Sequence, residues 1–394
     1  MTRLTTYDKT LSLLLLIMVA LTMPGCTADD YDENRRTVTV ELHPYVTQYC
    51  DPMSATTRGT WEPPTGYQPY SALLGIFPEQ QDLTNAPIGV YFTRDGKEAK
   101  LGAFSYYGAK WHLTLELNEA DTYYIYGYIP ARNITPAITP NDSYSNGATL
   151  TLNNLSTISN TDVCVIVGAK DGTSDDTVEG LAEGQFAYEA KVGEGPEYAN
   201  HVFLLFDHIY AGLRFSFKVN SSYAELRTIK LKKLELGYKG ETVDDVVNFA
   251  THKKYSTATV TLAKNGEGAT PIQSVSIVQD DTSEDTEAVT LFEANGETAP
   301  ITLDKTTATA FFGGFLPSSG SREFVLKSTY DVYDRNGNLI RKNCKATNTF
   351  NLATIFGSTL FARGTLLTLN LTVNPTYIYI LSDPDLDNPT VTMD

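Results

Sequence analysis

The chain has 394 residues, 42% of them hydrophobic, and a formal net charge of −17. This apolar fraction excludes an intrinsically disordered protein, and the length predicts two domains because single cores rarely grow beyond about 250–300 residues. The 47 acidic residues outnumber the 30 basic ones, which disfavours nucleic acid as a partner, since phosphate binding needs a basic face. The 28 Gly, 18 Pro and 24 Tyr favour short strands and turns over a helical bundle.

The first 26 residues have the organisation of a secretion signal. A charged start precedes the uncharged run 11–23, LSLLLLIMVALTM, which is shorter than the about 20 apolar residues that cross a bilayer as a helix. Gly25-Cys26 follows, and a cysteine at the cleavage position is typical of a bacterial lipoprotein, because its thiol accepts the lipid. We expect residues 1–25 to be removed and Cys26 to anchor the protein in the outer membrane. The simpler alternative is an ordinary cleavage site beside a chance cysteine.

An acidic run over 29–33 makes residues 26–36 a predicted tether. This run resembles the export signal that carries some Bacteroidetes lipoproteins to the cell surface. The alternative interpretation is a solvated, flexible tether that carries no targeting signal.

From residue 36 the pattern changes to the period of a strand. Val38, Val40 and Leu42 alternate with polar residues, which predicts a half-buried strand over Thr37–Leu42. Residues 44–70 follow as a long loop rich in Pro and Gly, and a loop of this kind is open to proteolysis. Further strands are predicted at 73–77, 89–93, 111–117, 123–129 and 163–167, and a Gly- and acid-rich linker at 168–200.

The second half repeats the same alternation. Leu213, Phe215, Phe217 and Val219 share one face of a predicted strand, and residues 367–373 behave alike. Residues 226–236 fit a strand or a helix, and the neighbouring strands favour a strand. Alternation without a sustained helical period predicts an all-β protein of two tandem antiparallel β-sandwich domains, residues 37–200 and 201–394, the second with a C-terminal tail.

No residue is nominated for catalysis, and we expect no enzyme, cofactor or metal site. Motifs for zinc hydrolases and the Gly-x-Ser-x-Gly elbow are absent, and no pair of histidines has the spacing of metal ligands. His208 beside Asp207 is a candidate triad member, but a strand-edge histidine explains it more simply. The histidines are His43, His112, His201, His208 and His252.

Three cysteines remain when Cys26 is set aside: Cys50, Cys164 and Cys344. They allow at most one disulfide, and a buried free thiol is the favoured interpretation for Cys164 because its strand is apolar. Near the C-terminus, Asp383, Asp385 and Asp387 are spaced like the start of a calcium loop. The glycine that such a loop requires is replaced by Asn388, so turn-forming Asp and Pro residues explain the run better.

The order of these features resembles the fimbrillin superfamily of Bacteroidetes pilins, including the Mfa-like proteins. The most specific parts are Phe206-Asp-His208-x-x-Ala211-Gly-Leu213-Arg-Phe215 and the glycine-led strand 364–373. The resemblance implies Greek-key, transthyretin-like sandwiches and a surface lipoprotein that assembles with other pilin subunits. It also implies that an Arg-specific protease removes the first strand, and that a neighbour's C-terminal strand fills the groove.

On this chain, the resemblance places the removable strand at Thr37, Val38, Val40 and Leu42, and the cut between Arg58 and Gly59. The donor strand would be Tyr377, Ile378, Tyr379, Ile380 and Leu381. Both faces of this segment are apolar, so we expect both to be buried. Charged and Pro residues at 383–389 follow the donor segment, so a tip, accessory or anchor subunit remains open beside a stalk subunit. The alternative function is a surface glycan-binding lipoprotein, because tyrosine rings stack on sugar faces.

Overall fold

The computed structural model describes most of the chain between residues 36 and 393. The described ranges are 36–47, 68–69, 88–107, 110–117, 120–159, 161–173, 180–193, 195–264, 270–280, 285–317, 323–356, 362–374 and 390–393. Several predicted sites lie outside the described residues: Cys26, Cys50, Arg58, Gly59, Tyr377, Ile378, Tyr379, Ile380, Leu381, Asp383, Asp385 and Asp387. Among the described residues, no helix has the length and apolar character that would let it cross a membrane.

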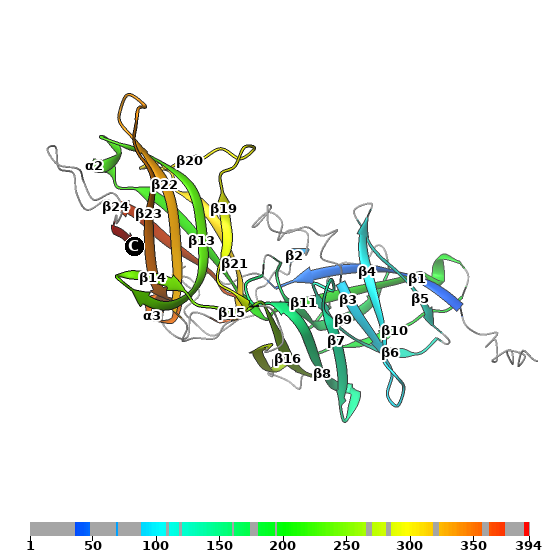
Figure 1. The fold of residues 1–394 in the computed structure, drawn as a ribbon. Helices are drawn as coiled ribbons and strands as arrows, with labels where there is room; N and C mark the ends of the chain where they lie inside the picture. The colour runs from blue at the N-terminus through cyan, green and yellow to red at the C-terminus, as the bar shows by residue number, and fades with distance from the viewer. Residues whose placement is uncertain are drawn as a thin grey trace, which may run out of the picture.

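The described residues are mostly strands, which confirms the predicted all-β fold (Figure 1). The first part holds β1 (Arg36–Val46), β2 (Gln68–Pro69), β3 (Ile88–Thr93), β4 (Lys100–Tyr107), β5 (Lys110–Leu117), β6 (Thr122–Ile129), β7 (Thr135–Asn141), β8 (Ser143–Ser156), β9 (Cys164–Gly172), β10 (Ala187–Glu189), η2 (Pro196–Tyr198) and β11 (Asn200–His208). Then follow β12 (Tyr210–Val219), α2 (Ser221–Ala224), β13 (Thr228–Val243), β14 (Val246–Phe249), β15 (His252–Lys253), β16 (Tyr255–Ala263), β17 (Ile272–Gln279), β18 (Asp285–Thr286) and β19 (Val289–Glu293). The last are β20 (Ile301–Thr302), β21 (Thr309–Pro317), β22 (Glu323–Tyr333), β23 (Leu339–Asn351), α3 (Leu352–Phe356), β24 (Leu366–Asn374) and β25 (Thr390–Met393).

The first sheet closes on itself. Its strands run in the order β10-β6-β3-β4-β5-β1-β11-β9, and β6 also pairs with β9 through Tyr128 with Val165 and Ile129 with Cys164. Alternate side chains from these strands share one buried cluster, because the period of two sends every second residue to the same face. As a result β1 is an interior member of a ring of strands and has a neighbour on each side.

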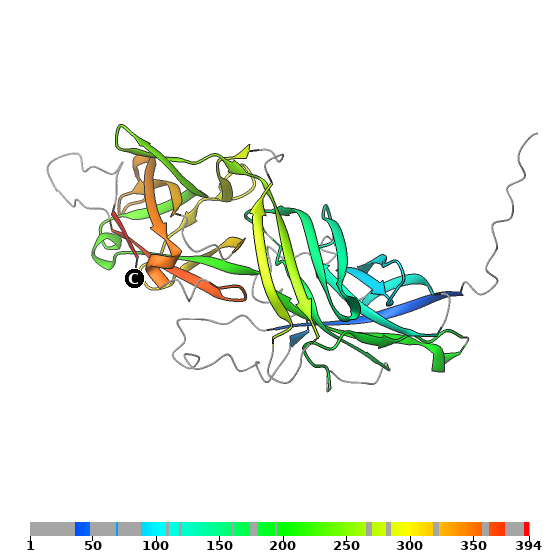
Figure 2. The ribbon, with the colours of Figure 1, turned by 90° about the horizontal axis from the view of Figure 1, so that it is seen from below.

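A second sheet, β17-β16-β8-β7, covers part of the first one. The two sheets share a buried cluster in which Tyr126 and Phe203 of the first sheet meet Leu150 and Val260 of the second. We call these two sheets the first lobe. Figure 2 shows β16 and β17 lying beside β8, although they follow residue 250 in the chain.

The tandem arrangement of the two domains is not confirmed. Strands β16 and β17 belong to the second half of the sequence, yet β16 pairs with β8 in the first lobe. The boundary near residue 200 stays a prediction, and at that position β11 pairs with both β1 and β9. The chain therefore passes between the lobes more than once.

The second lobe is formed by two sheets, β21-β12-β24-β25 and β14-β13-β22-β23, around one core. Leu213, Phe215, Phe217 and Val219 of β12 are all buried there, as the alternation predicts. The ambiguous segment 226–236 lies largely in strand β13. Most pairs are antiparallel, but β1–β11 and β12–β24 are parallel, which the sequence pattern does not reveal.

Candidate functional site: the slot of the first strand

Strand β1 lies between β5 and β11, so both of its backbone edges are paired. It runs antiparallel to β5 from Arg36 to Leu42 and parallel to β11 from Val40 to Val46. The predicted strand is therefore present and extends to Val46, while its removal stays a prediction. Without β1, the facing edges of β5 and β11 would expose unpaired N–H and C=O groups, which is the template that an added strand needs.

One face of β1 is deeply buried. Val40 and Val46 have no exposed surface, and Leu42 is 3% exposed. Each such aliphatic side chain contributes about 1.5–3 kcal/mol when it is buried. The slot is thus an apolar groove with two hydrogen-bonding edges, and any strand that fills it must carry apolar residues at alternate positions.

A buried polar cluster, which we call the latch, holds the end of β1 at Thr47. The Thr47 amide donates to the Phe206 carbonyl (3.0 Å), and its hydroxyl donates to the Asp207 carboxylate (2.9 Å). The Thr47 carbonyl lies 2.8 Å from Nε2 of His208, whose Nδ1 lies 2.8 Å from Asp162. Because both ring nitrogens face acceptors, His208 is a doubly protonated imidazolium here.

The electrostatics of the latch agree with a charged His208. Burial opposes the charge, but the carboxylates of Asp162 and Asp207 and the Thr47 carbonyl outweigh it, so the pKa of His208 is raised. Arg363, which lies just before β24, pairs with Asp207 and also approaches the His208 carbonyl at 3.3 Å. The latch therefore joins β1, β11 and the start of β24.

Cys164, His208 and Asp162 resemble a catalytic triad in composition but not in geometry. The Cys164 Sγ and the Asp162 carboxylate both face Nδ1 of His208, at 3.4 and 2.8 Å. A triad needs the nucleophile and the carboxylate on opposite ring nitrogens, and Nε2 is occupied by Thr47. All three residues are fully buried, and burial raises the pKa of the Cys164 thiol, so the cluster acts as a structural element. Cys164 is a buried free thiol, as predicted.

The latch makes stability depend on pH. The folded pKa of His208 lies above its ordinary value near 6.5, so its contribution is complete below that pH and is lost as the pH rises through the folded pKa. Burial, with the nearby Asp207 carboxylate, also raises the pKa of Glu183 to about 7, and its proton is lost in the same direction. We expect the melting temperature to fall as the pH rises from about 4.5 to about 7, where the folded state keeps the Glu183 proton, and to fall further above about pH 6.5, where it keeps the His208 proton. Thermal unfolding followed by circular dichroism checks this, and a steady or rising melting temperature would contradict it.

The other face of β1 carries a second polar group. Nε2 of His43 lies 3.1 Å from Nδ1 of His201 and 3.7 Å from the Glu41 carboxylate, whose other oxygen accepts from Lys110 (3.0 Å). Sequence spacing gave no hint of this group, because His43 and His201 are 158 residues apart and meet only through the β1–β11 pairing.

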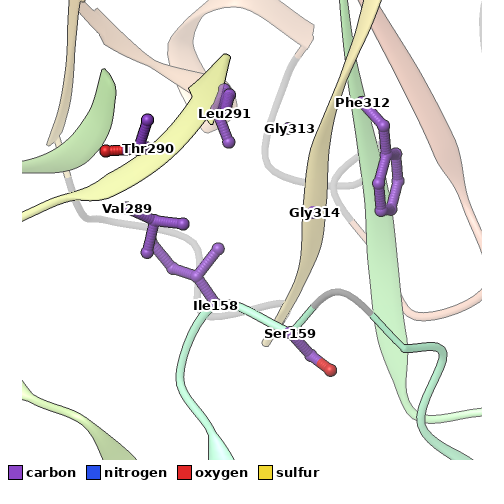
Figure 3. Close-up of a pocket in the computed structure, with 8 residues that line it drawn as sticks. All are labelled: Ile158, Ser159, Val289, Thr290, Leu291, Phe312, Gly313 and Gly314. Carbon is purple, nitrogen blue, oxygen red and sulfur yellow. The ribbon is translucent and has the colours of Figure 1, made fainter. Parts of the chain in front are cut away.

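A pocket of about 260 Å³ lies away from β1, between the loop after β8 and strands β19 and β21 (Figure 3). Val289 and Leu291 point toward Ile158 across it. The described residues that line it carry no titratable side chain, so they offer hydroxyls and backbone groups but no acid or base: Ile158, Ser159, Val289, Thr290, Leu291, Phe312, Gly313 and Gly314.

Comparison with known proteins gives structural resemblances alone. No family model matches the chain, and no curated protein matches it. The structure is similar to a candidate cell adhesion protein from Bacteroides fragilis, at 12% identity and a TM-score of 0.42, over 90% of this chain and 96% of that one. It is also similar to a fimbrial protein from Bacteroides vulgatus, at 12% identity and a TM-score of 0.39, over 90% and 98% of the two chains. The fimbrial anchor protein Mfa2 from Porphyromonas gingivalis is similar at 12% identity and a TM-score of 0.28, over 90% and 95%.

These structural neighbours are fimbrial and cell adhesion proteins of Bacteroidetes.

Proposed function

We propose that the protein is a structural and adhesive component of a cell-surface pilus, in which β1 is a removable strand. The position of β1 supports this most directly. It fills a slot with two hydrogen-bonding edges and an apolar floor, and a neighbouring subunit's strand would satisfy the same groups.

The chain connection around β1 fits such an exchange. Strand β2 pairs with β1 at Tyr45 and Val46, and Arg58 lies between the two strands in the sequence. A cut after Arg58 would free a fragment that contains β1 and holds on only by non-covalent contacts. The proposed donor is the segment Tyr377–Leu381 of another subunit, delivered to a surface where the lipid on Cys26 anchors the unprocessed protein.

The subunit position is part of the proposal. A stalk or tip subunit would lose β1 together with its lipid, whereas an anchor subunit would keep both. Other pilin subunits are the proposed partners in each case, and neither role requires an enzyme activity, a cofactor or nucleic acid.

The glycan-binding alternative gains nothing from the tyrosines that the structure shows to be buried. Ten of the 24 tyrosines are buried in the cores, so sheet packing accounts for much of the excess: Tyr91, Tyr123, Tyr126, Tyr128, Tyr144, Tyr188, Tyr210, Tyr223, Tyr238 and Tyr330. Such rings cannot stack on a sugar.

Replacing Arg58 by Ala is expected to block processing and assembly. Protein from the cell surface should begin at Gly59 in the unmodified chain and at Cys26 in the variant, as read by N-terminal sequencing. SDS-resistant ladders should disappear together with the Gly59 species, because the slot stays filled. Arg36→Ala is the matched control, since Arg36 is the first residue of β1 and a cut after it would leave the rest of the strand attached to the chain. Ladders from the Arg58 variant, or unmodified protein that begins only at Cys26 and forms no ladders, would argue against strand exchange.

A further inference from the structure

Three of the five histidines, His43, His112 and His201, lie on the same face of the first sheet as Glu41. Glu41 of β1 is directly opposite His201 of β11 and His112 of β5, and His43 follows two residues later on the same face of β1. The ligand atoms of Glu41, His43 and His201 lie within 4.8 Å of one another, and all three side chains are partly exposed.

The distances suit a small metal ion. Zinc bonds of about 2.0–2.2 Å place neighbouring ligand atoms of a tetrahedral site about 3.3–3.6 Å apart. The separations here are 3.1 Å between His43 and His201 and 3.7 Å between His43 and Glu41. Small changes of side-chain rotamer would therefore bring the three groups around one ion.

The surrounding residues orient the proposed ligands. The His43 ring stacks on Phe203 at 4.5 Å, which restricts its orientation. Lys110 holds Oε2 of Glu41 and leaves Oε1 facing His43. This outer hydrogen bond orients the carboxylate in the manner of metal sites.

We propose that Glu41, His43 and His201 bind a divalent transition-metal ion such as Zn²⁺, which cross-links β1 to β11. Imidazole nitrogens with one carboxylate oxygen suit zinc, copper and nickel better than calcium or magnesium. His112, opposite Glu41 on β5, is a candidate for a further ligand. The site exists only while β1 is in its slot, because two ligands come from β1 and one from β11.

Isothermal titration calorimetry tests the site, with ZnCl₂ added to the purified protein at pH 7.5 in a buffer that contains no other metal ion. We expect saturable binding of one ion and a higher melting temperature with zinc. His43→Gln and His201→Gln should each weaken binding by at least about tenfold, because each removes one of three ligands. His252→Gln is the matched control, since His252 lies on β15 and outside the group, and it should bind zinc like the unmodified chain. Absence of zinc binding, or unchanged affinity in both ligand variants, would overturn the proposal.

A second measurement needs no variant and is therefore independent of folding defects. X-ray absorption of the zinc-loaded, unmodified protein should show imidazole and oxygen ligands and no sulfur. A spectrum with a sulfur ligand would place the ion at a cysteine, such as Cys164 of the buried Asp162, Cys164 and His208 group, and would overturn the assignment.

A consequence for strand release rests on the proposed function. Once an Arg-specific protease has nicked the chain, zinc should slow the loss of the β1 fragment relative to EDTA, and His201→Gln should abolish the difference. Failure to cut or to release β1 at all would count against the proposed function, while the zinc titration would stand separately. Release at equal rates with saturating zinc and EDTA would refute the cross-link.

Discussion

Replacing His208 by Ala is expected to lower the free energy of unfolding by about 3–5 kcal/mol, as does the loss of one partner from other buried ion pairs. The Asp162 carboxylate is completely buried, and its Oδ1 has no hydrogen-bond partner among the described residues, so it depends on His208. The substitution would also leave the Thr47 carbonyl without the imidazole that holds the end of β1. Urea unfolding followed by circular dichroism gives the measurement.

A double-mutant cycle separates the ion pair from the loss of packing. Asp162→Asn removes the charge with little change of shape, so the double variant with His208→Ala should lose less than the sum of the two single variants. Additive losses would show that the pair is not coupled. A loss below about 1 kcal/mol for His208→Ala would contradict the latch as a source of stability.

The local patterns were readable from the sequence because burial follows the period of a strand. Val38, Val40 and Leu42 predicted β1, and Leu213, Phe215 and Phe217 predicted β12, and all of these side chains are buried. The pattern also placed Cys164 in the core as a free thiol. In each case the information lies within a few neighbouring residues.

Strand partners were not readable, because pairing is decided by contacts between distant segments. Nothing in the alternation of β1 indicates that its partners are β5 and β11, or that β11 runs parallel to it. The same limit hides the insertion of β16 and β17 into the first lobe. The predicted boundary near residue 200 rests on sequence order alone, and sequence order carries no information on this pairing.

The polar groups around β1 depend on that pairing and were missed with it. The sequence marks His208, beside Asp207, as a candidate triad member, but its partners Asp162 and Thr47 lie 46 and 161 residues away in the chain. His43 and His201 looked scattered for the same reason. The register between β1 and β11 would have revealed the contact of His43 with His201 and placed Thr47 near His208, while Asp162 needs the pairing of β9 with β11 as well.

Placing Asp at Val40 is expected to unfold the first lobe. Val40 has no exposed surface, and an unpaired carboxylate in such a core costs several kcal/mol, comparable to the total stability of about 5–15 kcal/mol of ordinary domains. Thr39→Asp is the matched control, because Thr39 is the neighbouring residue on the exposed face of the same strand. It should change stability by no more than about 0.5 kcal/mol. Near-native unfolding curves for both variants would show that the apolar face of β1 does not hold the lobe together.

The Val40→Asp chain also tests whether the slot accepts a strand from outside. Its own β1 no longer fits, so a synthetic peptide of residues 36–47 with the native sequence should bind and raise the melting temperature in proportion to the logarithm of its concentration. The peptide carries Val40, Leu42 and Val46 for the apolar floor, backbone groups for β5 and β11, and Thr47 for the latch. The same peptide with Val40→Asp should have no effect, because the carboxylate would again be buried without a partner. If both peptides raise the melting temperature equally, or if neither does, the slot does not select a strand by its alternating apolar face. The proposed exchange of strands between subunits would then lose its structural basis.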